Sequence, residues 1–384
     1  MDSAVDKFTF TLVLPLEYVS TENIAGFPND DMNAYLTAFD IHVNSPSLNL
    51  PPTKVDAKYC DGSKLSYILE HLYNAERMIY DWDGFKLLDE HYDFPDYLAY
   101  CCIEFTCSFE MKDYPEPEDL DDDGPLNLWG FANQGWYDDG GISIHIEAMD
   151  VFSDALLSVA ANVIAIMNLA RPGCVRSRCA FVDRGFVSET ITSTVPNIRG
   201  YKLSDLGDFF VRAAPGSPAY NEIEPEFRPP IFETVAPERL WTWAMGVTGF
   251  GDGQSSVTNV GRALNRYVSL FQRRSLGENI LTSVAALEAV FTTGRHRKQA
   301  QLIENIPLLI PVDKFFPGKS FRTLIEHLYE QRSRFAHGDN NVHNPFIEDL
   351  YDQEMRLAAM HAVALLIESL RRLGARQLTS YSPS

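Results

Sequence analysis

The residues of this 384-residue sequence that are best suited to chemistry are an arginine and a histidine five positions apart, Arg332 and His337. An imidazole exchanges protons near neutral pH, and a guanidinium holds a phosphate through two N–H donors, so the pair suits metal-independent cleavage of RNA. The same spacing occurs twice more, as Arg322/His327 and Arg356/His361. On spacing alone, a helix-end histidine beside a solvated arginine is the more ordinary interpretation.

Helix geometry distinguishes the three pairs. Two positions five apart are separated by about 140° around a helix, so a mid-helix pair points in different directions. His337 is followed by Gly338, a residue favoured at helix C-termini. We therefore expect the helix to end there, which lets the imidazole turn toward a site shared with Arg332. His327 and His361 are expected to be ordinary core or surface histidines.

Other polar residues are candidates for supporting roles. Ser333 can donate a hydrogen bond to a phosphate, and Arg334 or Arg322 can hold the flanking backbone of an RNA. A further basic cluster stands in a predicted loop and could act in the same way, with ordinary solvation as the alternative; it consists of Arg295, Arg297 and Lys298.

Glu288 is an acidic residue in an otherwise apolar helix face, which includes Leu281, Val284, Leu287 and Phe291. A carboxylate in such a position needs a partner if it is buried, and an arginine of the helix that carries Arg332 is the natural candidate. We predict this structural pairing in preference to a direct catalytic role.

The sequence around these residues resembles the Apea-like branch of HEPN domains. The resemblance rests on Asn279–Phe291, which contains Ala-Leu-Glu-Ala, followed by Leu328–Gly338, which contains Tyr-x-x-Arg-Ser and His-Gly, and by a long last helix. It covers residues 240–376, and the order of these motifs is more specific than the Arg/His spacing. Where active HEPN nucleases often have Asn, Asp or His after the motif arginine, this chain has Ser333.

The resemblance implies a compact α-helical domain that commonly dimerises, with the motif arginine and histidine of each copy meeting at the interface. Many such domains are metal-independent endoribonucleases in defence, toxin and abortive-infection systems. Carried over by position, Arg332 and His337 are the motif pair. Attack of an RNA 2′-OH on its own 3′-phosphate would use His337 as acid or base and Arg332 to stabilise the charge on the phosphate.

The elements that must position these residues are predicted to be helices. Candidate helices cover residues 257–273, 278–292, 297–309, 320–336 and 346–373. Together they predict an all-α HEPN helical bundle over residues 238–384. The glycine-rich turn over 249–253 lacks the lysine of a nucleotide-binding loop and is interpreted as a helix entry.

The preceding region, residues 1–214, is predicted to be α+β. Strands are predicted over 8–15, 98–109 and 142–147, and helices over 64–80 and 151–169. A proline-rich stretch over 215–237 is the predicted linker between the two parts. The fold class expected is therefore an α+β region followed by a helical bundle.

The two parts of the sequence also differ in net charge. The net charge is −21, of which residues 1–240 contribute −24 and residues 241–384 contribute +3. This excludes a protein that coats nucleic acid over its whole surface but permits a local RNA site. The acidic region is interpreted as a regulatory or sensing region, or as a binding module for a basic partner protein.

Cofactor and metal sites are not expected. Asp119–Gly124 resembles the start of a calcium-binding loop, but position twelve is Gly130 where a glutamate would close the loop, so a solvated acidic loop is predicted. The six cysteines form no paired CxxC motifs, which favours reduced thiols and a cytoplasmic location. The N-terminus lacks the pattern of an export signal, and the apolar run over 155–170 is too short and polar to suggest a membrane span.

The leading hypothesis is thus a HEPN-type endoribonuclease that acts as a defence or toxin effector. Its expected partners are an RNA substrate, with tRNA as one candidate, a second copy of the chain in a homodimer, and a regulatory protein; no membrane partner is expected. The alternative is a catalytically silent HEPN scaffold or a module that binds a ligand or protein.

Overall fold

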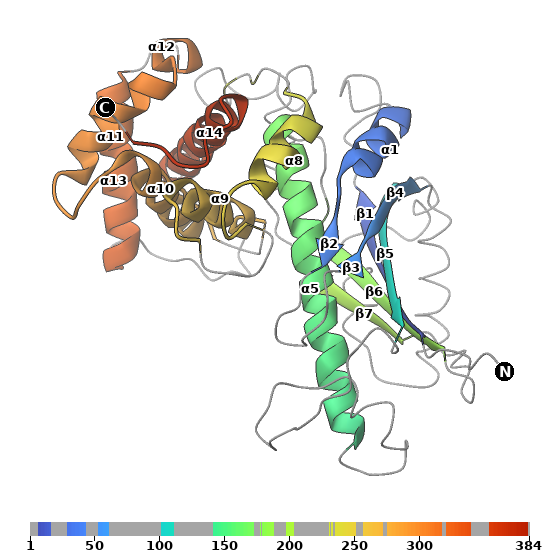
Figure 1. Cartoon of the computed structure of the whole chain (residues 1–384). Helices are drawn as coiled ribbons and strands as arrows, with labels where there is room; N and C mark the ends of the chain where they lie inside the picture. The colour runs from blue at the N-terminus through green and yellow to red at the C-terminus, as the bar shows by residue number, and fades with distance from the viewer. Residues whose placement is uncertain are drawn as a thin grey trace.

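The computed structural model describes residues 7–16, 29–43, 53–60, 101–110, 141–172, 177, 179–187, 197–202, 230, 232, 235–250, 256–271, 275–316, 320–338 and 353–382. Within these ranges, an N-terminal antiparallel β-sheet region is followed by a C-terminal region of several packed helices (Figure 1). This is the order of fold classes that the sequence predicts.

The larger sheet has the strand order β4-β5-β1-β6-β7, and every neighbouring pair is antiparallel. Its strands are β1 (Lys7–Leu16), β4 (Asp56–Cys60), β5 (Cys101–Glu110), β6 (Cys179–Val187) and β7 (Asn197–Lys202). Strand β1 is central, and its register with β5 places Lys7 opposite Glu110 and Leu16 opposite Cys101. The strand predicted over 8–15 is confirmed, and so is the described part, 101–109, of the strand predicted over 98–109.

One face of this sheet packs against a long helix, α5 (Gly141–Ala170). Alternate residues of β1, such as Phe10 and Leu12, are buried on that face, and the ring centroid of Phe10 lies 4.4 Å from that of Phe152 on α5. The residues of β1 in this core alternate along the strand, as expected for side chains on one face, although Val13 and Pro15 between them are buried as well. The remaining described N-terminal elements are α1 (Asn29–Ala38), β2 (His42–Val43) and β3 (Thr53–Lys54).

Helix α5 corrects one sequence prediction. The helix predicted over 151–169 is present, but it begins at Gly141, so the strand predicted over Ile142–Glu147 is wrong. The alternation there spans only six residues, and no glycine or proline separates it from the apolar helix that follows. Adding residues to an existing helix costs less than nucleating a separate element, so the helix extends through them.

The apolar part of α5 lies mostly inside the protein. Within α5 the apolar stretch extends over Phe152–Ala170, which by length and composition alone could cross a membrane, but most of it is buried within the structure. That burial is what a core helix of a folded domain shows.

The helical region consists of α8 (Pro237–Met245), α9 (Asn259–Ser269), α10 (Leu276–Phe291), α11 (Lys298–Leu309), α12 (Val312–Phe315), α13 (Phe321–His337) and α14 (Gln353–Ala375). The five predicted helices correspond to α9, α10, α11, α13 and α14, with ends that differ by a few residues. The first part of the helix predicted over 346–373, residues 346–352, lies outside the described part. Helix α10 begins with a capping box, in which the side chains of Ser275 and Glu278 each bind the other's backbone N–H.

Other predictions lie wholly or partly outside the described residues. These are the helix over 64–80, the acidic loop over 119–124 and most of the linker over 215–237. The turn over 249–253 is described at its first two residues, where Gly249 has a φ of 82° between α8 and α9. Among cysteines with described side chains, Cys60, Cys102 and Cys107 form no disulfide, and burial raises the pKa of Cys107 to about 12.

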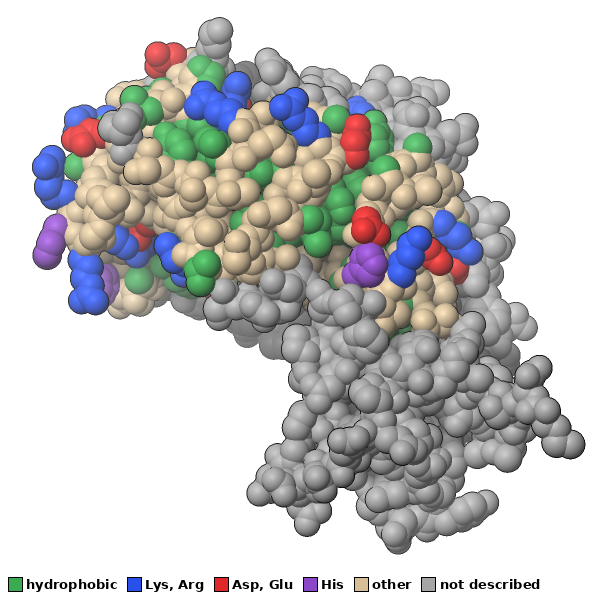
Figure 2. Space-filling model, in the orientation of Figure 1, with side chains coloured by type: hydrophobic (Ala, Val, Ile, Leu, Met, Phe, Trp, Pro, Cys, Tyr) green, Lys and Arg blue, Asp and Glu red, His purple; other side chains and the backbone are tan. Residues whose placement is uncertain are grey.

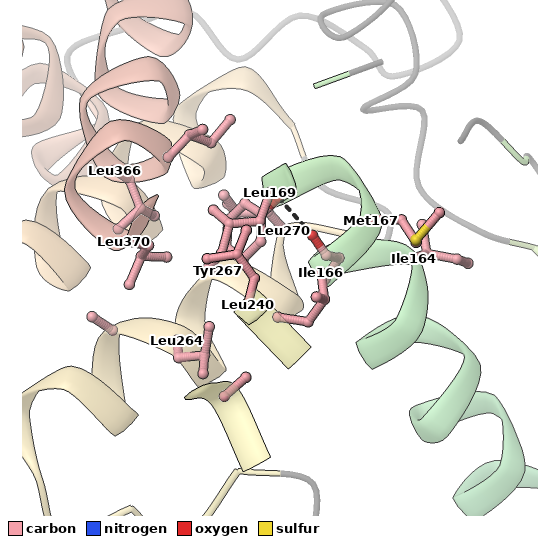
Figure 3. Close-up of a cluster of buried hydrophobic side chains, with 14 of the residues drawn as sticks. Ile164, Ile166, Met167, Leu169, Leu240, Leu264, Tyr267, Leu270, Leu366 and Leu370 are labelled. Atoms are coloured by element: carbon pink, nitrogen blue, oxygen red, sulfur yellow. Dashed lines mark hydrogen bonds between the residues drawn. The ribbon is translucent and has the colours of Figure 1, made fainter. Parts of the chain in front are cut away.

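The C-terminal end of α5 is built into the helical region. Figure 3 shows Ile166 and Leu169 of α5 beside Leu240 of α8, Tyr267 of α9 and Leu370 of α14. The Tyr267 hydroxyl donates a hydrogen bond of 3.0 Å to the carbonyl oxygen of Ala165. Apolar packing and a specific hydrogen bond thus join α5 to the helices that follow.

Arg371 of α14 caps the end of α5. Its Nη1 donates to the carbonyl oxygens of Leu169 and Ala170, at 2.7 and 2.8 Å, and its Nε lies 3.3 Å from Glu368. The last carbonyls of a helix have no partner within that helix, and a cation there also interacts favourably with the helix dipole. The Arg371 side chain is only 3% exposed, so these bonds are shielded from water.

We expect Arg371→Met to lower the free energy of unfolding by about 3 kcal/mol, because it leaves two buried carbonyls and Glu368 without this partner. Arg372→Met is the matched control. Arg372 neighbours Arg371 and contacts the same carboxylate at 2.7 Å, but its side chain is 39% exposed. We expect it to cost about 1 kcal/mol or less. Urea unfolding of the full chain measures both, and equal losses would contradict the role assigned to the cap.

Candidate functional site

The candidate site is built on α13, which ends where the sequence predicts. His337 is its last residue, and Gly338 follows with a φ of 73°, a left-handed conformation that glycine adopts without steric cost. The N–H of Gly338 donates to the carbonyl oxygen of Phe335 at 3.2 Å. The side chains of His337 and Ser333 are exposed. The end of α13 therefore presents an imidazole to solvent.

A close contact holds this end of α13 against α10. A Cβ atom added to Gly277 would lie 2.1 Å from ring atoms of Phe335, far inside normal contact distance. Glycine at this position thus allows the Phe335 ring to lie directly on the backbone of α10. Because Phe335 is two residues before His337, this contact helps to fix where the imidazole emerges.

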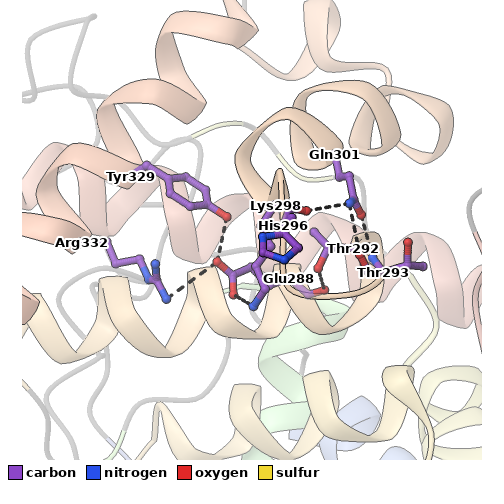
Figure 4. A network of polar contacts seen from close by, with 8 residues as sticks. All are labelled: Glu288, Thr292, Thr293, His296, Lys298, Gln301, Tyr329 and Arg332. Atoms are coloured by element: carbon purple, nitrogen blue, oxygen red, sulfur yellow. Dashed lines mark hydrogen bonds and ion pairs between the residues drawn. The ribbon is translucent and has the colours of Figure 1, made fainter.

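Glu288 of α10 is the centre of a polar network that involves three helices (Figure 4). Its Oε2 accepts a hydrogen bond of 2.6 Å from Lys298 Nζ of α11, and its Oε1 accepts one of 2.7 Å from the Tyr329 hydroxyl of α13. Arg332 Nη2, also on α13, lies 3.8 Å from Oε1. The Glu288 side chain is only 6% exposed. A buried carboxylate therefore connects the beginning of α11 to the middle of α13.

These partners keep Glu288 ionised. Burial alone would raise its pKa, but hydrogen bonds from Lys298 and Tyr329, together with the charges of Arg332 and Lys298, outweigh burial and lower the pKa. Burial and the contact with Glu288 raise the pKa of Tyr329, so its hydroxyl stays protonated and donates. The network thus contains one anion and two cations.

Arg332 is only partly satisfied in this network. Its Nη2 pairs with Glu288, and its Cζ lies 5.6 Å from the centroid of the Tyr329 ring, within range for a cation–π contact. Its Nε is buried and has no hydrogen-bond acceptor among the described residues. The side chain is 35% exposed, so the guanidinium borders solvent as well as the network.

The predicted pairing of Glu288 with an arginine of the motif-bearing helix is observed as the Arg332 ion pair. Arg332 and His337 themselves share no hydrogen bond or ring contact in the described part of a single chain. This agrees with the wide angle between positions five apart on a helix. Their convergence across two copies stays a prediction.

The remaining sequence candidates are spread over the surface and mostly face acids. Arg334 lies 3.9 Å from Glu354, Arg322 lies 3.9 Å from Glu326, and Arg297 lies 3.7 Å from Glu304.

Lys298 is the first residue of α11 and is bound to Glu288, while Arg295 is exposed in the preceding loop. The candidate basic cluster is therefore divided between the Glu288 network and the surface.

The histidines of the two other Arg/His pairs have ordinary surroundings. His361 is 5% exposed and its ring packs against Phe316 at a centroid distance of 5.3 Å. His327 Nε2 lies 3.4 Å from the carbonyl oxygen of Glu354. His361 is thus a buried histidine and His327 a partly exposed one, in agreement with the expectation that they are ordinary core or surface histidines.

Tyr329 and Lys298 as partners of Glu288 are absent from the sequence predictions. Tyr329 has a detectable signal, because it precedes Arg332 by three residues and so lies on the same face of α13. Lys298 has no such signal in the sequence. It reaches Glu288 only because the turn between α10 and α11 reverses the direction of the chain.

Comparison of the chain with protein-family models, with curated proteins and with solved structures finds no match. Within the described ranges, no three His, Cys, Asp or Glu side chains gather in the way that would hold a metal ion.

We expect Glu288→Gln to lower the free energy of unfolding at pH 7 by about 2 kcal/mol, because a neutral amide cannot compensate Lys298 and Arg332. The folded-state pKa of Glu288 is lowered, so its stabilisation is complete above the ordinary carboxyl pKa of about 4.3 and is lost as the pH falls through the folded value. The difference between wild type and variant should therefore narrow in acid. Urea unfolding at several pH values measures it.

Glu304→Gln is the control for this measurement. Glu304 faces Arg297 at 3.7 Å, but its side chain is 62% exposed, so its replacement should change stability by about 0.5 kcal/mol or less at any pH. A pH-independent loss in Glu288→Gln would contradict an ionised Glu288.

Proposed function

We propose that the chain is a metal-independent endoribonuclease of the HEPN type, acting as a defence or toxin effector. The observation that carries the proposal is the arrangement of α13, which bears Arg332 beside the Glu288 network and ends in the exposed imidazole of His337. The resemblance of residues 240–376 to Apea-like HEPN domains supports the same function. A cytoplasmic location and a homodimer are part of the proposal.

The charge of Arg332 favours a phosphate. Lys298 and the Tyr329 hydroxyl already satisfy the Glu288 carboxylate, so the addition of Arg332 leaves the network with an excess of one positive charge. A phosphate at the exposed edge of the guanidinium would supply a counter-charge. The N–H without an acceptor among the described residues is the buried Nε, which is not part of that edge.

The proposed reaction is transesterification within the RNA chain. One His337 removes the proton from a 2′-OH, whose oxygen attacks the adjacent phosphorus while the bond from phosphorus to the 5′-oxygen breaks. The His337 of the second copy gives a proton to the departing 5′-oxygen. Arg332 stabilises the charge that gathers on the phosphate oxygens. The products are a 2′,3′-cyclic phosphate and a 5′-OH.

A second candidate function is a catalytically silent HEPN scaffold that binds a protein or ligand. It is favoured by one observation: Arg332 pairs with Glu288 and has no contact with His337 within a single chain. In a scaffold, the Glu288 network would serve only to hold three helices together.

The deciding experiment incubates the purified full chain with tRNA or total RNA in the presence of EDTA. We expect cleavage that yields cyclic-phosphate ends and that falls about 100-fold or more in His337→Ala, the usual contribution of an acid–base group. His327→Ala is the matched control, because this histidine lies on the same helix and has only a long contact with a backbone carbonyl.

Intact RNA with the activated wild-type protein would contradict the nuclease proposal. Equal cleavage by wild type and His337→Ala would contradict it as well. If Arg332→Ala and His337→Ala also left the biological phenotype intact, the scaffold function would be the one supported.

A further inference from the structure

The turn between α10 and α11 places basic side chains next to the Glu288 network. We define the basic loop as Thr293–Arg297, and all five of its residues are exposed. It contains Arg295, His296 and Arg297 in succession. Figure 2 shows Lys, Arg and His side chains at the edge of the helical region where α11 and α13 lie in Figure 1.

One glutamine fixes the shape of the basic loop. Gln301 Oε1 accepts a hydrogen bond of 2.7 Å from the N–H of Thr293, and its Nε2 donates to the carbonyl oxygens of Thr293 and His296, both at 3.1 Å. A single side chain in α11 thus ties two points of the loop to the helix that follows it. A loop held in this way loses less conformational entropy when it binds a ligand.

The basic side chains of this region are of two kinds, those that pair with a glutamate and those that have no acidic partner among the described residues. Lys298 is bound to Glu288, and Arg297 lies 3.7 Å from Glu304. The side chains of Arg295 and His296 have no hydrogen bond or ion pair with any described residue. The first turn of α11 contains no acidic residue that could neutralise them. Arg295 and His296 are therefore the groups that can accept an external anion.

The basic loop is close to the motif arginine. Lys298 immediately follows the loop, and its Nζ contacts the same carboxylate as Arg332 Nη2. Arg295 is three residues before Lys298, so their Cα atoms are at most about 11 Å apart. A single-stranded RNA that places one phosphate at Arg332 can therefore reach Arg295 within a few nucleotides.

We propose that Arg295 and His296 bind a backbone phosphate of the RNA substrate on one side of the bond that is cleaved. This inference rests on the proposed nuclease function for its substrate class and deepens it by assigning a subsite. The contact is to the phosphate and not to a base, so the subsite adds affinity for longer RNA without selecting a sequence.

The test compares Arg295→Ala/His296→Ala with Arg266→Ala in the full chain. Arg266 is an exposed arginine of α9 whose side chain has no ion pair with a described residue, so each variant removes one arginine. Each change is made in the His337→Ala background to keep the RNA intact. The probe is a fluorescent ten-nucleotide RNA, and its Kd is measured by anisotropy at several salt concentrations.

We expect the loop variant to raise the Kd about tenfold and to reduce the slope of log K against log salt concentration by about one. The Arg266 variant should leave both nearly unchanged. Equal Kd values for the loop variant and its background would overturn the inference, and so would equal losses in the loop and Arg266 variants.

A cleavage assay with the native His337 separates this inference from the proposed function. The loop variant should raise the KM for the ten-nucleotide RNA about tenfold at unchanged kcat, and should leave cleavage of a dinucleotide unaffected. Absence of cleavage by every form would overturn the nuclease function, while the binding measurement would still decide the phosphate subsite.

Discussion

The helical region depends on the neutralisation of one buried carboxylate. Glu288 stands where its neighbours on α10 form an apolar core, and a charge there is costly unless it is paired. Lys298, Tyr329 and Arg332 supply the pairing, and in doing so they fix the start of α11 and the rotation of α13. The positions of the basic loop and of Arg332 are both tied to these contacts.

The same network sets the chemical character of Arg332. An arginine paired alone with a carboxylate would have its charge compensated and would offer little to a phosphate. Here the carboxylate also serves a lysine and a tyrosine, so the guanidinium keeps its excess charge at the border of solvent. A network that stabilises the fold is therefore compatible with binding of an anion at its exposed side.

Much of this arrangement follows from local sequence rules. The end of α13 was predictable because Gly338 suits a left-handed cap, and the partner of Glu288 was predictable because a buried charge requires one. The strand expected at Ile142–Glu147 was wrong because a six-residue alternation cannot compete with an adjoining long helix. Lys298 could not be assigned to Glu288 from sequence, since only the tertiary path of the chain brings them together. The proposed meeting of His337 with a second copy of the chain lies equally beyond local rules.

The cap that Arg371 places on α5 has a mechanical consequence. A helix of 30 residues is about 45 Å long, so α5 extends from the helical region along the whole sheet (Figure 1). With its C-terminal end bound at Leu169 and Ala170, α5 is a lever arm, and a tilt of about 5° at that end moves the other end by about 4 Å. Any such tilt would have to be accommodated by the two carbonyl bonds of Arg371, by the hydrogen bond from Tyr267 and by the apolar packing around the end of α5.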